Sequence, residues 1–286
     1  MPSTYAHKYF GDRILRRDLP ALKGLTPEQR ELFFIGLHGP DILFYYKALT
    51  VNKVNAVGFG QHEKPAADFF GPAAALVRAM PAEEQNLSQA YLMGFLCHFA
   101  LDSACHGYIE QKIHVSGVTH TEIEGEFDRC LMAEQGLDPV RQNLTGHIHP
   151  TAAHSRVIAP FFSTVTPKEV EKSLRSMIFY NRLLIAPSAW KRSLVKGVLR
   201  LSGNYTEMHG MLINPQPDPR CADSCVRLKK LMDRAEEQCL ALMEGYLPCL
   251  KEERPLPEGL DRTFGAGSNW QKIPVLSLEK ELVYEV

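Results

Sequence analysis

Three side chains of types that bind metal ions recur at four-residue intervals in the otherwise apolar stretch FLCHFALDSACHGYI, residues 95–109. They are His98, Asp102 and His106. On an α-helix of 3.6 residues per turn, a step of four residues advances about 40° around the axis, so the three lie within an arc of about 80°. Burying two imidazoles and a carboxylate on one helix face is unfavourable unless something compensates their polarity and charge. A bound metal ion would compensate both.

A second pair of the same kind follows at His120 and Glu124, again four residues apart. Thr119 and Glu122 have the spacing of a capping box, which places the pair in the first turn of the next helix. Metal sites in helical bundles are built from ligands on facing helices, and zinc takes both histidine nitrogen and carboxylate oxygen. A plainer interpretation stays open, because a core histidine can bond to a backbone carbonyl and an i, i+4 His–Asp pair can simply stabilise its helix.

Three further candidates stand alone in the sequence. His7 lies among aromatic residues in TYAHKYFGDRIL, Asp41 follows a helix-breaking Gly-Pro pair in GLHGPDILFYY, and His62 precedes an expected helix start in GFGQHEKPAADFF. Taken singly, Asp41 is typical of a helix N-cap and His62 of a surface residue. They are candidate metal ligands because of their order along the chain, ahead of the H-x3-D and H-x3-E pairs.

In this order of motifs the chain resembles the zinc-dependent phospholipase C family, over about residues 1–130. The all-helical fold of that family is shared with the fungal single-strand-specific nucleases, and its members hold a cluster of zinc ions and cleave phosphodiesters. Zinc can neutralise the anionic oxygens of such a substrate and lower the pKa of a bound water toward about 7. The resemblance implies a ligand set of His7, Asp41, His62, His98, Asp102, His106, His120 and Glu124.

The resemblance divides these ligands among two or three zinc ions. It assigns the first ion to Asp41, His62, His98 and Asp102, and the second to His106, His120 and Glu124. A third ion would share Asp102, which bridges two metals in the family, and would use His7 with the chain terminus. Asp41 is implied either as a ligand or as the catalytic general base. The chain differs from secreted members in the four-residue step from Asp102 to His106 and in its Met1-Pro2 start, where those members use a tryptophan ligand.

Several neighbouring residues are alternatives or supporting candidates. His38 can line the same pocket, and His114 can replace His106 as a ligand. Asp128 returns to the face of Glu124 and can orient a ligating histidine, whereas Glu126 is expected in solvent. Three aromatic residues form either a substrate-stacking wall or ordinary core: Phe44, Tyr45 and Tyr46.

The rest of the sequence predicts an all-α fold, a single bundle of roughly eight to ten helices. Capping boxes open helices at Thr26 and Thr166 as well as Thr119, a helix over 62–80 is expected to break near Gly71-Pro72, and a helix over 221–247 is expected to end before Pro248. Strand and hairpin patterns are poor. We expect a helical domain over residues 1–250 and an extended C-terminal tail over 251–286, rich in Pro and Gly.

Composition limits the function classes. The net charge of −1 and pI of about 6.8 give no basic excess for nucleic acid. The N-terminus lacks the apolar block of a signal peptide, no stretch is apolar enough to span a membrane, and seven irregularly spaced cysteines are expected as reduced thiols. Together these features favour a cytoplasmic location. The oligomeric state is not indicated.

The resemblance implies a hydrolase acting on a small phosphodiester or a phospholipid headgroup, without the C-terminal β-sandwich with which toxin-type members bind membranes. A nuclease or nucleotide phosphodiesterase on the same scaffold is the second hypothesis. A non-catalytic zinc-stabilised helical protein is the third, although structural zinc sites are usually closed and contain cysteines.

Overall fold

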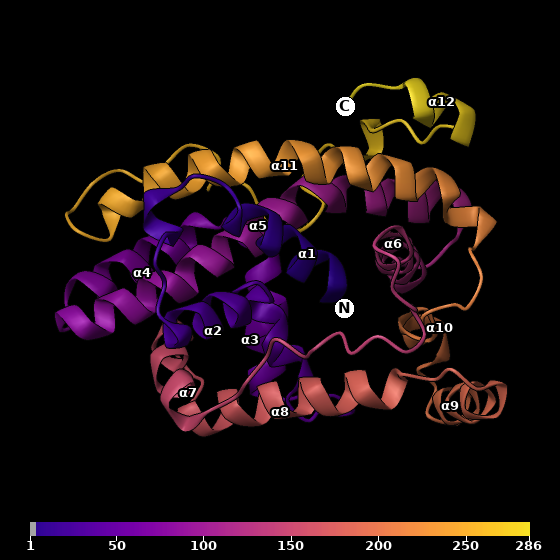
Figure 1. The fold of residues 1–286 in the computed structure, drawn as a ribbon, viewed down its shortest axis with the longest axis horizontal. Coiled ribbons are helices and arrows are strands. Elements are labelled where there is room, and N and C mark those ends of the chain that lie inside the picture. The colour runs from indigo at the N-terminus through magenta and orange to yellow at the C-terminus, as the bar shows by residue number, and fades with distance from the viewer. Residues whose placement is uncertain (1–3) are drawn as a thin grey trace.

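The computed structural model describes residues 4–286, and within them the chain forms twelve α-helices and six short 3-10 helices (Figure 1). The described part holds no β-strand, only an isolated antiparallel bridge between Pro65 and Thr263. None of its helices combines the length and apolarity needed to cross a bilayer. The predicted all-α fold is confirmed. The α-helices are α1 Thr4–Leu15, α2 Pro27–Gly36, α3 Lys53–His62, α4 Ala67–Arg78, α5 Ala82–Ser116, α6 His120–Glu134, α7 Ala152–Ile158, α8 Pro167–Leu184, α9 Ala189–Leu201, α10 Tyr205–Met208, α11 Ala222–Cys249 and α12 Leu278–Val283.

Helix α5 is the centre of the bundle. Every residue from 90 to 102 is buried, because α2 and α11 pack along the helix and further helices close its remaining sides (Figure 1). Glu83 and Glu84 in its first turn complement the helix dipole, and Gly117 ends it in a left-handed conformation with φ of 68°. A helix enclosed on all sides has no polar face, so the His98–Asp102–His106 row points into protein and not into solvent.

The capping boxes form as the sequence predicts. Thr26 caps α2, Thr119 caps α6 and Thr166 caps α8, each in a reciprocal pair with the residue three positions on. Such a cap satisfies backbone N–H groups that have no partner within the helix. A fourth box, Asn52 with Asn55, opens α3. The start of α6 therefore fixes the backbone that carries His120.

Two expected helix ends are wrong. The chain does not break at Pro72, which lies inside a continuous α4; the break precedes it, after His62 at the end of α3. Likewise α11 continues through Pro248 to Cys249. A proline removes one helical hydrogen bond, and around Pro72 the burial of Phe69 and Phe70 outweighs that loss. The helix count exceeds the expectation because α7, α10 and α12 are too short to show a periodic pattern.

The last residues pack back onto the bundle. Phe264 is fully buried, and the Arg227 guanidinium of α11 donates to both oxygens of Glu281 in α12, at 2.8 and 2.9 Å, in a buried ion pair. Within 251–286 the described chain includes a 3-10 helix, Trp270–Lys272, besides α12. The division of the chain at residue 250 stays a prediction.

Close contact of α2 with α5 requires two glycines. A Cβ on Gly36 would overlap the carbonyl oxygen of Tyr91 and lie 2.9 Å from the amide nitrogen of Phe95, and a Cβ on Gly94 would overlap the carbonyl oxygen of Phe33. We expect Gly36→Ala to lower the free energy of unfolding by about 1–3 kcal/mol, because the backbones must separate. Denaturant unfolding followed by circular dichroism measures the change.

The matched control is Gly60→Ala in α3, where a Cβ meets nothing within 4 Å. This control should be neutral or stabilising by about 0.5–1 kcal/mol, since alanine favours a helix over glycine. Equal stability of Gly36→Ala and the unmodified chain would show that the two helices are not in contact as described.

Candidate metal centre

The eight predicted ligands converge at one place in the bundle. They come from five elements: α1 contributes His7, the 3-10 helix Gly39–Tyr45 contributes Asp41, the last turn of α3 contributes His62, α5 contributes the row of three, and α6 contributes His120 and Glu124. Five of the eight are buried, and the other three, His62, His106 and His120, are partly buried.

Asp102 lies at the centre of this cluster and faces four imidazoles. Its Oδ1 is 3.1 Å from His7 Nε2 and 3.8 Å from His106 Nε2. Its Oδ2 is 3.1 Å from His98 Nε2 and 3.8 Å from His62 Nε2. Each carboxylate oxygen thus meets a different pair of rings, which is the geometry that a carboxylate shared by two cations requires.

Asp41 closes the cluster on the other side of two of these rings. Its Oδ1 is 3.0 Å from His62 Nε2, and its Oδ2 is 3.5 Å from His98 Nε2. Ligand atoms of His7, Asp41, His98 and Asp102 all lie within 4.8 Å of one another. Four ligands about 2.0–2.2 Å from a zinc ion fit within such a span.

A second group adjoins the first. Ligand atoms of His106, His120 and Glu124 also lie within 4.8 Å of one another. Glu124 Oε1 is 3.1 Å from His120 Nε2 and 3.7 Å from His106 Nε2. The contact between His106 and Asp102 joins the two groups. The four-residue spacing, in which the chain differs from secreted family members, therefore still places both side chains in one cluster.

Two of the imidazoles are oriented by backbone carbonyls. His62 Nδ1 lies 3.0 Å from the carbonyl oxygen of Gly58, and His106 Nδ1 lies 2.7 Å from that of Phe264. Because a carbonyl can only accept, each Nδ1 carries the proton and donates it. Once the ring has lost its second proton, the Nε2 atom that faces the carboxylates is left with a lone pair for a metal.

Unsatisfied buried atoms indicate that a cation fits here. Both oxygens of Asp41, Oδ2 of Asp102, Oε2 of Glu124 and both ring nitrogens of His98 are buried and make no hydrogen bond to the described residues. Leaving buried polar atoms without partners costs about 1–3 kcal/mol each, more for charged groups. The donor set of imidazole nitrogens and carboxylate oxygens suits zinc.

The charges of the cluster shift its pKa values strongly. Burial acts to raise the pKa of Asp102, but His98, His106 and His7 outweigh it and hold that pKa well below its usual range. Burial acts to lower the pKa of His106, yet Asp102 and Glu124 raise it to about 9. The pKa values of His7 and His62 are likewise raised, against their burial, by the nearby carboxylates of Asp102 and Asp41.

Neither alternative ligand, His38 or His114, is part of the two groups. His38 is nevertheless fully buried near His7 and His98, and burial, together with the charges of neighbouring histidines, lowers its pKa well below the usual range. His38 Nε2 is 2.8 Å from His147 Nε2, and the ring of His114 packs edge-on against Trp270. Asp128 accepts from the backbone N–H groups of Tyr5 and Ala6, at 3.0 and 2.8 Å, so it caps the start of the helix that carries His7.

Glu126, expected in solvent, is only 3% exposed and pairs with Arg129 at 2.6 Å. The expectation failed because the face of α6 opposite Glu124 is also covered, by α11. Among the aromatic candidates, Tyr45 belongs to the core, whereas Phe44 stacks on Phe59 at 4.3 Å and lies 5.3 Å from the ring of His62.

Sequence reasoning missed two residues that shape the centre. Gly39 has φ of 47°, and a Cβ there would come within 2.6 Å of Cγ in the His98 ring, so only glycine lets the Asp41 segment pass this histidine. The Gly-Pro-Asp motif was the available signal. Phe264 lies 158 positions after His106, and nothing in the sequence around it indicates that its carbonyl accepts from that ring.

The comparisons with known proteins point to one family. A family model described as zinc dependent phospholipase C matches residues 6–175 of the chain. No curated protein and no solved structure matches the chain. The matched residues include all eight members of the cluster and exclude Phe264.

Zinc binding at pH 7 should release protons from the metal-stripped protein. With its pKa raised to about 9, His106 is protonated at that pH, and a metal ligand must be deprotonated. Calorimetric titration with zinc in two buffers of different ionisation enthalpy counts the protons. The number should fall as pH rises through about 9.

His106→Asn should reduce the proton count by about one. His149→Asn is the control, because that imidazole is 58% exposed and pairs with Glu31 outside the cluster. Heats that are identical in the two buffers at pH 7 would contradict the prediction.

Proposed function

The chain belongs to the zinc-dependent phospholipase C family, and from this we propose that it is a zinc-dependent hydrolase of phosphodiesters with a phospholipid-type headgroup as its substrate. The observation that carries the proposal is the position of Asp102, whose two oxygens each face two imidazoles of a buried cluster. A structural role would need only one closed group of four ligands. Two adjoining groups around a shared carboxylate are what phosphoryl chemistry uses.

We assign the ligands to at least two zinc ions. His7, Asp41, His98 and Asp102 would hold one, and His106, His120 and Glu124 the other. The family resemblance assigned His62 to the first ion and His7 to a third, but His7 takes the place of His62 in the compact group, and His62 adjoins it at 3.0 Å from Asp41 Oδ1. Bound zinc would offset the negative charge of the phosphoryl oxygens and make water more acidic. The protein's own contribution is to fix the imidazole orientations, through Gly58 and Phe264, and to keep water from the buried carboxylates.

Access to the cluster comes from the side of α6 and α8. His120 is the most open member of its group, with 36% side-chain exposure against 12% for His106. A small cavity beside it is lined by Glu124, Thr121, Asn181, Leu184 and Ile213, among others. That cavity is about 30 Å³, room for about one water molecule, so a substrate phosphate would reach the second group at the exposed edge of His120.

Phe44 and Phe59 are the proposed contacts for the rest of the substrate. Phe44 is 8% exposed and Phe59 56%, so this stacked pair runs from His62 to the surface. Aromatic faces bind a choline-type ammonium through cation–π attraction. They equally stack on a nucleobase, which makes a nuclease or nucleotide phosphodiesterase the second candidate.

A panel of phosphodiesters tests the reaction. Purified protein should contain zinc, hydrolyse p-nitrophenyl-phosphocholine and lose that activity with a chelator, because charge neutralisation at phosphorus depends on the metal. Turnover of bis-p-nitrophenyl phosphate and single-stranded DNA alone would favour the nuclease. Zinc without turnover of any of these diesters would leave a non-catalytic zinc protein.

Asp41→Asn should lower kcat by at least about 100-fold, the range that a general base or a displaced ligand contributes. Elemental analysis separates the two roles: the metal content falls if Asp41 is a ligand and is retained if it is the base. Asp138→Asn is the control, since this exposed aspartate pairs with Arg141 at the surface, away from the cluster. Full activity in Asp41→Asn would remove this residue from the centre.

A further inference from the structure

One segment of the chain is strongly basic in a protein that is nearly neutral overall. Residues 172–206 contain no Asp or Glu, whereas the whole chain has a formal net charge of −1. This segment forms most of α8 and all of α9. Its cationic residues are Lys172, Arg175, Arg182, Lys191, Arg192, Lys196 and Arg200.

Helix α9 exposes a row of large apolar side chains. Trp190 is 71% exposed, Leu194 59%, Val198 56% and Leu201 91%. Their spacing places all four within an arc of about 80°. The opposite face holds α9 to the protein through the buried Leu199, so the apolar row has no partner within the described chain.

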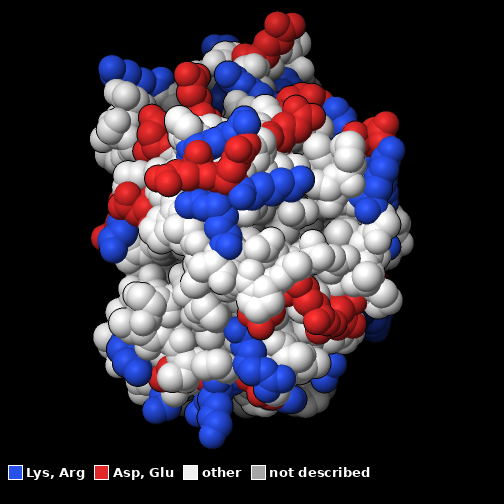
Figure 2. Space-filling view, turned by 90° about the vertical axis from the view of Figure 1, so that its left-hand side faces the viewer, with Lys and Arg blue, Asp and Glu red and all other residues white. Residues whose placement is uncertain are grey.

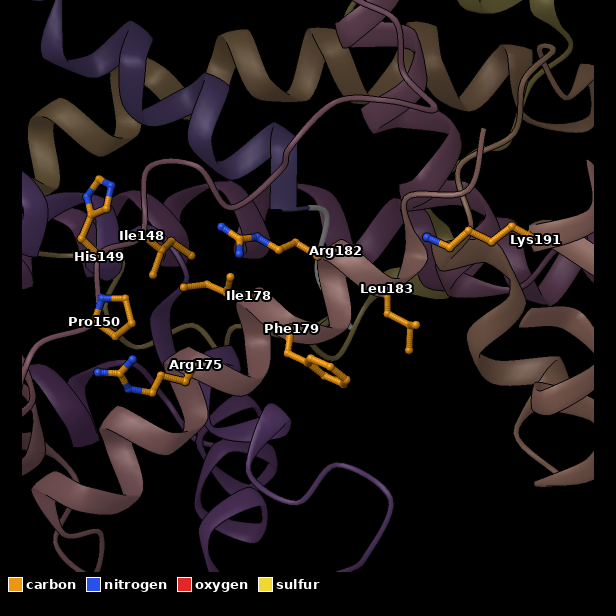
Figure 3. Close-up of a pocket in the computed structure, with 9 residues that line it drawn as sticks. All are labelled: Ile148, His149, Pro150, Arg175, Ile178, Phe179, Arg182, Leu183 and Lys191. Carbon is orange, nitrogen blue, oxygen red and sulfur yellow. The ribbon is translucent and has the colours of Figure 1, made fainter. Parts of the chain in front are cut away.

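The outer face of α8 continues the same character. Phe179 is 61% exposed and Leu183 46%, one turn apart. Figure 3 shows both projecting from α8 to the side away from Arg182, whose guanidinium extends toward the Ile148–Pro150 loop. Residues of α8, this loop and Lys191 of α9 line a shallow hollow of about 790 Å³. Apolar and cationic groups therefore alternate over the surface of both helices.

These two helices lie on one side of the molecule. Figure 1 shows α8 and α9 along its lower edge, with α11 and α12 at the upper edge. Figure 2 shows the left-hand face, away from α9, where Lys and Arg side chains gather along the lower margin and acidic and basic residues mix in the upper half. On α9, Lys191 and Arg200 flank the exposed apolar row, whereas Arg192 turns inward and donates to the carbonyl oxygens of Leu212 and Ile213.

We propose that the outer face of α8 and α9 docks on an anionic phospholipid surface. A helix that pairs a Trp- and Leu-bearing face with flanking Lys and Arg lies in the headgroup region, its apolar side chains reaching the acyl boundary. Cations contact lipid phosphates and carboxylates, and indole favours the interface. A second copy of the chain is the poorer occupant, because a self-complementary contact would bring two basic surfaces together.

This inference rests on the proposed function and deepens it, since it makes a bilayer the source of the phosphodiester. The inner side of α8 borders the metal centre: Asn181 and Leu184 line the cavity that reaches Glu124. The outward Phe179 and Leu183 belong to the same turns of this helix. Docking would therefore place the lipid surface one helix diameter, about 10 Å, from the metal centre.

Vesicle co-sedimentation of the full-length protein tests the docking. It should sediment with phosphatidylcholine vesicles that contain phosphatidylserine, far less with pure phosphatidylcholine, and less again at high salt. The double variant Leu194→Ser/Val198→Ser should bind at least about tenfold more weakly, because it loses buried apolar area. In a Trp270→Phe background, vesicles should shift the Trp190 emission to the blue.

The matched control is Leu282→Ser/Val283→Ser, which removes two similarly exposed apolar residues, 62% and 81%, from α12 on the opposite side. It should bind vesicles as the unmodified chain does. Equal binding of the α9 double variant, or indifference to phosphatidylserine, overturns the proposal. So does a dimer in sedimentation velocity that the α9 double variant abolishes, because the face is then a self-interface.

Activity separates this inference from the proposed function. The α9 double variant should hydrolyse soluble p-nitrophenyl-phosphocholine at the unmodified rate and lose most of its rate on anionic vesicles. Asp41→Asn should keep vesicle binding and lose turnover on both. Vesicle binding without any turnover by the unmodified chain would sink the proposed hydrolase and leave the docking surface standing.

Discussion

Asp102 is a carboxylate with 3% exposure whose oxygens face four imidazole nitrogens in the centre of a helical bundle. An unpaired charge at this depth would cost several kcal/mol, so the surrounding elements must supply compensating groups with fixed geometry. α1 does so with His7, α3 with His62, and α5 itself with His98 and His106. The position of every one of these elements is thereby tied to the charge at one point on α5.

That constraint explains several features of the fold that otherwise look unrelated. Gly36 and Gly94 let α2 approach α5 closely, which brings the following Asp41 segment within reach of His98. Gly39 lets that segment pass the imidazole ring. Asp128 holds the first turn of α1, from which His7 reaches Asp102. In each case backbone geometry near the cluster is set by a residue that does not belong to it.

Helix α8 connects the centre to the surface. One side of it contributes Asn181, which is buried and donates to the hydroxyl of Tyr45 at 3.4 Å. The other side and the following α9 carry exposed apolar and cationic groups that protein packing does not account for. The proposed hydrolysis of lipid diesters would need both a water-excluded site and a solvent-facing surface for the lipid. The two sides of this helix carry the candidates for both within a few residues of each other.

The sequence alone determined the helical class and grouped five of the eight cluster residues. Four-residue spacing fixes which side chains share a helix face, and Ser/Thr caps mark helix starts, because both depend on local backbone geometry. For this reason His98, Asp102, His106, and the pair on α6 could be grouped without coordinates. His7, Asp41 and His62 have no such local relation, and only a family resemblance joined them to the rest.

Tertiary structure alone decided which groups meet. The grouping of His7 with Asp41, the carbonyl of Phe264 on His106, and the burial of Glu126 depend on how separate helices pack. The same holds for the continuous helix through Pro72, where burial outweighs the local preference to break. The apolar row on α9 is an ordinary amphipathic pattern in the sequence, and only the tertiary structure shows that this row faces solvent. Local sequence sets the face of a helix, but the direction in which that face points is fixed by contacts distant along the chain.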